Sequence, residues 1–205
     1  MKHTRIIVTH YGGPDALQVR EEECPEPKDG EVRVRVLAAG VSLPDIMMRE
    51  GIHPETPRLP FTPGWDLIGT VNRLGGGISG LEPGQIVAAL PISGAYAEFV
   101  CLSQRELVPV PSGLDAAEAV SLVLNYVTAY QMLHRSAKVR LGQRVLIHGA
   151  AGGVGSAPGS VPSNWARQLP RCRSTARTRS SSACRNVNWS RCRPAWTPPR
   201  PSASC

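Results

Sequence analysis

The first hundred residues alternate between short apolar runs and turns rich in glycine and proline. The alternation is clearest over 31–37, where Val32, Val34 and Val36 would share one face of a half-buried strand. Similar runs predict strands over 5–9, 17–21, 67–74, 83–90 and 95–102, a short helix over 46–50 and a proline-rich loop over 51–64. Short strands at close spacing indicate a β-rich module.

Beyond this module the pattern becomes helical. Asp115 stands three residues before Glu118 and just before an apolar run, which is the arrangement of a helix N-terminus. Helical sequence extends to about His134, with a break predicted near Asn125. An apolar run over 145–148 then predicts the first strand of an α/β unit.

A glycine cluster follows this predicted strand directly and leads into a predicted helix. It reads Gly149-Ala-Ala-Gly152-Gly153-Val154-Gly155. Gly149 would let the chain turn sharply, Gly152 would let backbone N–H groups approach phosphate oxygens, and Gly155 would let the helix pack closely. The G-x-x-G-x-x-G spacing is one residue off the commoner dinucleotide fingerprint, and glycine turns also follow strands for structural reasons. The pattern therefore predicts either a dinucleotide pyrophosphate site or a structural turn.

Together these elements predict an α/β chain. A β-rich domain is expected over 1–124, and the beginning of an incomplete α/β nucleotide-binding unit over 125–157. His148, at the end of the predicted strand, is expected to be packed or solvent-bonded rather than catalytic.

Composition separates the last quarter of the chain from the rest. The 205 residues carry a formal net charge of +7, but residues 158–205 hold nine of the 23 basic residues and none of the 16 acidic ones. Residues 1–157 therefore carry a formal charge of −2. The 158–205 tail also has seven prolines and nine serines and no helical or strand period, which is typical of disorder.

The remaining composition argues for a cytoplasmic chain. No apolar stretch reaches membrane-spanning length, and the first residues lack the pattern of a secretory signal, so no membrane partner is expected. Outside the tail the cysteines are Cys24 and Cys101, and the four tail cysteines form no C-x-x-C pair. Neither a disulfide framework nor a zinc ribbon is predicted.

Six stretches between residues 5 and 157 occur in the order of one known family. They are Tyr11-Gly-Gly-Pro-Asp-Ala-Leu, Ala38-Ala-Gly-Val-Ser-Leu-Pro-Asp45, Leu59-Pro-Phe-Thr-Pro-Gly64, Gly94-Ala-Tyr-Ala-Glu98, Asn125-Tyr-Val-Thr-Ala-Tyr130 and 145–155. On these stretches the chain resembles the medium-chain dehydrogenase/reductase superfamily, in its zinc-free quinone oxidoreductase (zeta-crystallin-like) branch. The resemblance implies a GroES-like catalytic domain, a Rossmann domain and an active site in the cleft between them. Family members usually use NADPH to reduce quinones or activated double bonds. They often form homo-oligomers, but the interface is expected to be lost in this chain.

The resemblance also bears on zinc. Zinc alcohol dehydrogenases of the superfamily have Cys where Ser42 stands and His-Glu where Trp65 and Asp66 stand. A hydroxyl and an indole cannot replace a thiolate and an imidazole as zinc ligands, so no metal is predicted. Asp66 is expected either to have a structural role or to support the residues that contact a ligand.

By resemblance, the chain's cofactor-binding residues fall into two groups. Thr128 would lie near the nicotinamide of NADPH, and Ser42 and Asp45 near the cleft, although the family commonly has Asn at position 42. The residues that would face the pyrophosphate are Gly152, Gly153, Val154 and Gly155.

Tyr126 is the one candidate for a catalytic hydroxyl, which it could offer to a substrate oxygen. The alternative is that Tyr126 and Tyr130, four residues apart on one helix face, are interdomain packing residues. No general acid is assigned, because quinone reduction can take its second proton from water.

The tail has the composition of a chain translated in a shifted frame. Reading Asn164, Trp165 and Ala166 from the last base of the preceding codon forces Leu-Gly, and permitted codons beyond allow a helix followed by a strand. Under this hypothesis the rest of the Rossmann sheet is lost. The residue that selects NAD or NADP, which is expected roughly 20 residues past the first glycine, is lost with it. The chain is then expected to bind NADPH weakly and to turn over little. Sequencing the gene across this point tests the hypothesis.

The sequence thus predicts a zinc-independent oxidoreductase that transfers a hydride from NADPH to a quinone or activated enone. Two alternatives come from other classes. One is a non-catalytic structural protein, as crystallin-type family members imply. The other is an RNA-binding protein that uses the basic tail, although the tail has no RNA-binding motif and nucleic acid is not the expected partner.

Overall fold

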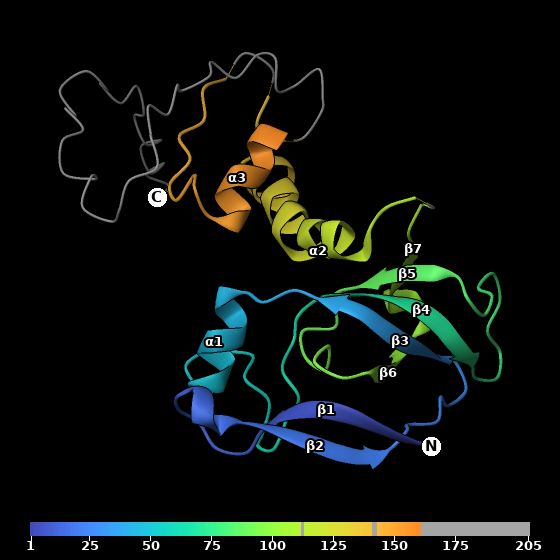
Figure 1. Cartoon of the computed structure of the whole chain (residues 1–205). Coiled ribbons are helices and arrows are strands. Elements are labelled where there is room, and N and C mark those ends of the chain that lie inside the picture. Colours follow the sequence, from blue (N-terminus) through green and yellow to red (C-terminus); the bar gives the residue numbers. More distant parts are fainter. Residues whose placement is uncertain (112, 141–142, 161–205) are drawn as a thin grey trace, which may run out of the picture. The chain divides into compact units, whose positions relative to one another are not determined.

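The computed structural model describes residues 1–111, 113–140 and 143–160 (Figure 1). The strands are β1 (Lys2–Val8), β2 (Leu17–Glu23), β3 (Glu31–Ala39), β4 (Leu67–Leu74), β5 (Ile86–Ala89), β6 (Phe99–Ser103) and β7 (Leu107–Pro109). The helices are α1 (Leu43–Arg49), α2 (Ala116–Tyr130) and α3 (Gly153–Ser160), with short turns η1 (Pro14–Ala16) and η2 (Gln104–Glu106) and a π-helical segment η3 (Gln131–Ser136). The α/β class and the β-rich first part are as predicted.

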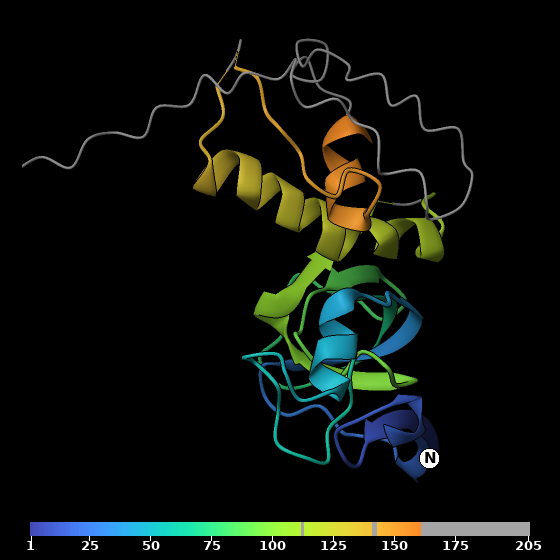
Figure 2. The same ribbon diagram turned by 90° about the vertical axis from the view of Figure 1, so that its left-hand side faces the viewer.

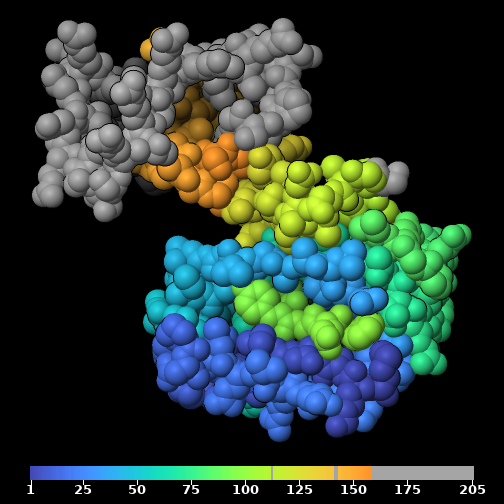
Figure 3. Space-filling view, viewed as in Figure 1, coloured from blue at the N-terminus to red at the C-terminus, as the bar shows by residue number. Residues whose placement is uncertain are grey.

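The strands form two antiparallel sheets. A hairpin of β1 and β2 makes the smaller sheet, and it lies along one border of the strand-rich region (Figure 3). The larger sheet has the strand order β6-β3-β4-β5-β7. The three valines of β3 contact one apolar cluster as predicted, since Val32 and Val34 are buried in it and Val36 packs against it, but Arg33 between them is buried as well.

Apolar packing places α2 on the larger sheet. Ile68 of β4 is buried with Ala119 and Val120 of the helix, and further small apolar side chains from β3 and β5 surround them. Helix α3 in turn contacts α2 and crosses it (Figure 2). The glycine cluster at the start of α3 is thereby connected to the sheet through α2.

The strand predicted over 145–148 is wrong. Residues 143–147 have no regular secondary structure, and Leu146 is 75% exposed. A strand exists through hydrogen bonds to a neighbouring strand, and within the described residues this segment has none beside it. The apolar run is therefore extended chain rather than part of a sheet.

The helix break predicted near Asn125 is also wrong. Helix α2 continues from Ala116 to Tyr130 and passes into the π-helical η3 only at Gln131. The boundary placed between residues 124 and 125 lies inside this continuous helix, and the division into domains stays a prediction. Of the predicted tail, residues 158–160 end α3 and the rest lie outside the described residues.

Two further features of the described residues bear on the sequence expectations. None of their helices is long and apolar enough to cross a membrane. Cys24 and Cys101 are both free thiols.

Candidate functional site

Asp45 connects the start of α1 to the loop that precedes β4 through hydrogen bonds. Its Oδ2 accepts hydrogen bonds from the backbone N of Ser42 at 2.8 Å and from Ser42 Oγ at 2.6 Å. Its Oδ1 accepts one from the backbone N of Gly64 at 3.0 Å. Asp45 is buried, so these contacts are its means of offsetting desolvation. The structure brings the predicted pair together, while their role toward a cofactor stays a prediction.

Asp66 makes a second buried carboxylate contact close by. Its Oδ1 accepts from the backbone N of Gly40 and its Oδ2 from the backbone N of Leu124, both at 3.1 Å. Burial raises the pKa of Asp66, and the negative charge of Asp45 adds to the rise, while the two backbone N–H groups oppose it. Its contacts are of the structural kind expected from the sequence.

Tyr96 completes this polar cluster, and sequence reasoning gave it no role. Its hydroxyl donates to the carbonyl of Gly40 at 3.1 Å. Burial and the neighbouring charge of Asp45 raise its pKa, so Tyr96 keeps its proton over the physiological range. The only signal in the sequence was the family-like stretch that contains it.

The glycine turn has the compact geometry that its spacing requires. Gly149 has a φ of +63°, in the left-handed region, and its carbonyl accepts from the N of Gly152 at 2.8 Å. A Cβ at Gly155 would overlap the Gly149 carbonyl oxygen, so α3 packs against the turn only because residue 155 is glycine. Gly152 and Gly153 are exposed, whereas Val154 is half-buried.

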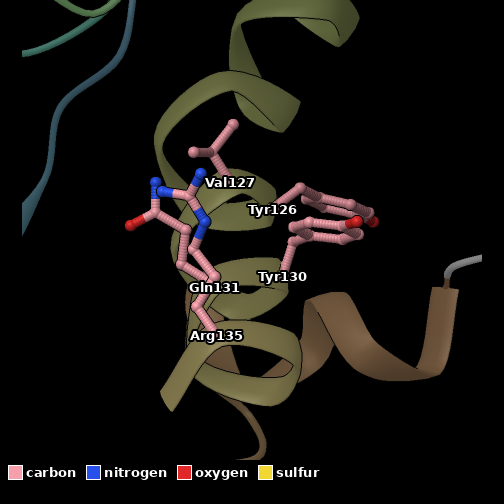
Figure 4. Close-up of a pocket in the computed structure, with 5 residues that line it drawn as sticks. All are labelled: Tyr126, Val127, Tyr130, Gln131 and Arg135. Carbon is pink, nitrogen blue, oxygen red and sulfur yellow. The ribbon is translucent and has the colours of Figure 1, made fainter. Parts of the chain in front are cut away.

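Tyr126 and Tyr130 lie on an open groove along α2 and η3. The groove has a volume of about 420 Å³ and is lined by Tyr126, Val127, Tyr130, Gln131 and Arg135. Figure 4 shows the two tyrosine rings side by side and directed the same way. Tyr130 is 62% exposed and its ring lies 4.4 Å from that of His134. The described residues therefore do not bury Tyr130 in an interdomain contact.

The predicted site residues occupy three places rather than one. Ser42 and Asp45 lie at α1, Tyr126 and the half-buried Thr128 on α2, and the glycine turn at α3. The groove contains Tyr126 but none of the others. His148 is exposed, which agrees with the solvent-bonded alternative and not with the packed one.

The positions of the zinc ligands in related dehydrogenases have other contacts here. Ser42 donates to Asp45, Asp66 accepts from two backbone N–H groups, and the Trp65 ring lies edge-on to His53 at 5.3 Å. Within residues 1–111, 113–140 and 143–160, no three His, Cys, Asp or Glu side chains are grouped so as to hold a metal ion.

Comparison with known proteins agrees with this architecture. Residues 28–112 match the alcohol dehydrogenase GroES-like domain. The chain is 38% identical over 152 residues to the synaptic vesicle membrane protein VAT-1 homolog-like of Mus musculus, and 37% identical over 154 residues to the quinone oxidoreductase of Homo sapiens. Each match covers 74% of this chain, but only 36% and 47% of the respective relative. The chain thus spans less than half the length of these relatives.

The fold is shared with solved structures as well. A mycobacterial protein solved as a complex with NADPH is 34% identical, with a TM-score of 0.70. The similarity covers 76% of this chain and 48% of that one.

Proposed function

Since the chain belongs to the medium-chain dehydrogenase/reductase superfamily, we propose that it takes part in hydride transfer from NADPH to a quinone or an activated enone, without zinc. The observation that carries the proposal is the glycine turn that leads directly into α3, because a glycine turn at a helix N-terminus is the arrangement that holds a dinucleotide pyrophosphate. A quinone oxidoreductase among the relatives and an NADPH complex among the structural neighbours support the substrate and the cofactor.

The glycine turn fits the pyrophosphate part of a dinucleotide. The first N–H groups of a helix have no acceptor within the helix, so those of Gly153, Val154 and Gly155 are available to phosphate oxygens. Among the described residues, a Cβ added at Gly152 would lie 3.3 Å from the Gly149 carbonyl oxygen, a tight contact that favours glycine at this position. These residues would hold the pyrophosphate.

The surrounding charge favours an anionic ligand. Residues 119–160 contain four lysines and arginines and no aspartate or glutamate. Such an imbalance attracts phosphates and adds to the positive end of the α3 dipole. NADPH rather than NADH is proposed from the family.

NADPH, when bound, supplies the hydride, and the chain's own residues orient the reactants. Ser42 donates its one hydroxyl proton to Asp45, so toward a ligand Ser42 Oγ can only accept. A donor that polarises the substrate oxygen must therefore come from elsewhere. Tyr126 is the candidate for this donor, and the role of Thr128 toward the nicotinamide is proposed from the family resemblance.

An oxidation assay tests the proposal. The purified 205-residue chain is mixed with NADPH and either a benzoquinone or an enone, and loss of nicotinamide absorbance is followed. We expect slow, acceptor-dependent oxidation, and about a tenfold lower kcat/KM for Tyr126→Phe, which loses one hydrogen bond to the substrate oxygen. Rates equal to the protein-free control with both acceptors would contradict the proposal.

A cytoplasmic location stays a prediction. The RNA-binding alternative depends on residues outside the described part of the chain, and no contact of the described residues favours it or a purely structural role.

A further inference from the structure

The Asp66 carboxylate joins two parts of the chain that are 58 residues apart. It stands directly before β4, and one oxygen binds the N–H of Gly40, the residue that follows β3. The other oxygen binds the N–H of Leu124 in the middle of α2, and the side chain is 4% exposed. One buried carboxylate therefore spans the larger sheet and the helix.

We propose that Asp66 is a positioning residue that fixes the register of α2 on the larger sheet and so places the glycine turn relative to the catalytic domain. What the turn binds rests on the proposed function, but the positioning itself does not.

Apolar packing alone leaves the register of α2 open. The contact of Ile68 with Ala119 and Val120 is non-directional, so a helix can slide on such a surface at small cost. A hydrogen bond is directional and marks one N–H along the helix. Leu124 lies inside α2, away from both of its ends, so the contact with Asp66 is not a helix cap.

The sheet side of the contact is fixed from two directions. A Cβ at Gly40 would overlap Asp66 Oδ1, so the close approach requires glycine at this position. The carbonyl of the same Gly40 accepts from the Tyr96 hydroxyl at 3.1 Å. Gly40, which holds Asp66 on the sheet side, is therefore itself held by Tyr96.

The contact continues from α2 to the glycine turn. Asn125 follows Leu124 directly, and a Cβ added at Gly153 would lie 2.6 Å from Asn125 Nδ2. The Asn125 amide and the first residue of α3 are therefore in direct contact. A shift of α2 on the sheet would move the start of α3 with it.

The burial of Asp66 is unfavourable in itself. Its raised pKa has desolvation as the main cause, so burial disfavours the ionised carboxylate relative to the protonated one despite its two N–H donors. A buried charge that does not stabilise the fold can still select one arrangement among several. Fixing the register of α2 is such a role.

Hydrogen–deuterium exchange on the full chain tests the proposal. Asp66→Asn keeps the side-chain shape but can accept only one of the two N–H bonds. We expect exchange over 120–130 and 149–156 to become about tenfold faster, which corresponds to one lost charge-assisted hydrogen bond, with β3 and β4 unchanged. Unchanged exchange over these two segments, or equal acceleration everywhere, would overturn the proposal.

Asp45→Asn is the matched control, because Asp45 is an equally buried carboxylate that binds α1 and Gly64 rather than α2. It should accelerate exchange over 43–49 and leave 120–130 unchanged. Should Asp66→Asn fail to fold, Asn125→Ala tests the second link and is expected to accelerate exchange over 149–156 alone. No acceleration there would overturn the link.

Nucleotide binding separates this proposal from the proposed function. Asp66→Asn should weaken NADPH binding several-fold, although Asp66 is not proposed to touch the nucleotide. If the wild-type chain does not bind NADPH, the proposed function fails, and the exchange pattern still decides the role of Asp66.

Discussion

At the residue scale, two buried carboxylates connect separate parts of the chain through backbone N–H groups. Asp45 accepts from the start of α1 and from a loop, and Asp66 accepts from the end of β3 and from α2. Burial and the nearby charge of Asp45 raise the pKa of Asp66 above its ordinary value of 3.8. The folded chain therefore keeps this proton to a higher pH than the unfolded chain does.

The raised pKa predicts a pH-dependent stability difference between the wild type and Asp66→Asn. Between the ordinary value of 3.8 and the raised pKa, the folded wild type binds more protons than the unfolded chain. The wild type should therefore lose stability relative to the non-titrating variant as the pH rises through this window. Urea unfolding at a series of pH values measures the difference, and a difference that grows in favour of the wild type would contradict the assignment.

At the element scale, helix α2 is the part that connects the sheet to the glycine turn, and its start is well defined. Asp115 Oδ1 accepts from the N of Ala117 at 2.9 Å and from the N of Glu118 at 3.2 Å. These contacts satisfy two N–H groups that the helix itself leaves unpaired.

Removing this cap should destabilise α2. Asp115→Ala is expected to lower the free energy of unfolding by about 1 kcal/mol, and Asp115→Asn, which also caps well, by only a few tenths. Urea denaturation followed by helical circular dichroism measures both variants. Equal stability of Asp115→Ala and the wild type would mean that the cap does not support the helix.

The sequence predicted correctly those elements whose residues carry a local pattern. Alternation located β3, and the Asp115 signal located the start of α2. The run over 145–148 has a strand's sequence but no neighbour among the described residues, which no local pattern can reveal. Asn125 weakens a helix by propensity, yet here its amide contacts Gly153 and the helix continues, because tertiary contact overrides propensity.

At the scale of the whole molecule, the candidate site is distributed over α1, α2 and the turn before α3. Residue types and a family resemblance identified Ser42, Asp45 and the glycines. They could not identify Leu124, because it contributes a backbone N–H group, which any residue type except proline can supply. The connection between the parts of the site is therefore visible only in the fold.

The central claim is that the glycine turn before α3 is a pyrophosphate site, and one pair of variants tests it most directly. Gly152 is exposed and immediately precedes α3, where both Asp and Asn favour a helix start. Gly152→Asp and Gly152→Asn are nearly isosteric and differ by one negative charge at the position proposed to face phosphate. NADPH is titrated into both isotope-labelled chains, and the amide signals of residues 152–156 are followed by NMR.

Binding, even if weak, should shift these signals and saturate in Gly152→Asn. In Gly152→Asp the dissociation constant should be about tenfold higher, because a carboxylate near the pyrophosphate repels it by roughly 1.4 kcal/mol. Equal dissociation constants for the two variants, or shifts that do not involve residues 152–156, would contradict the assignment of the glycine turn.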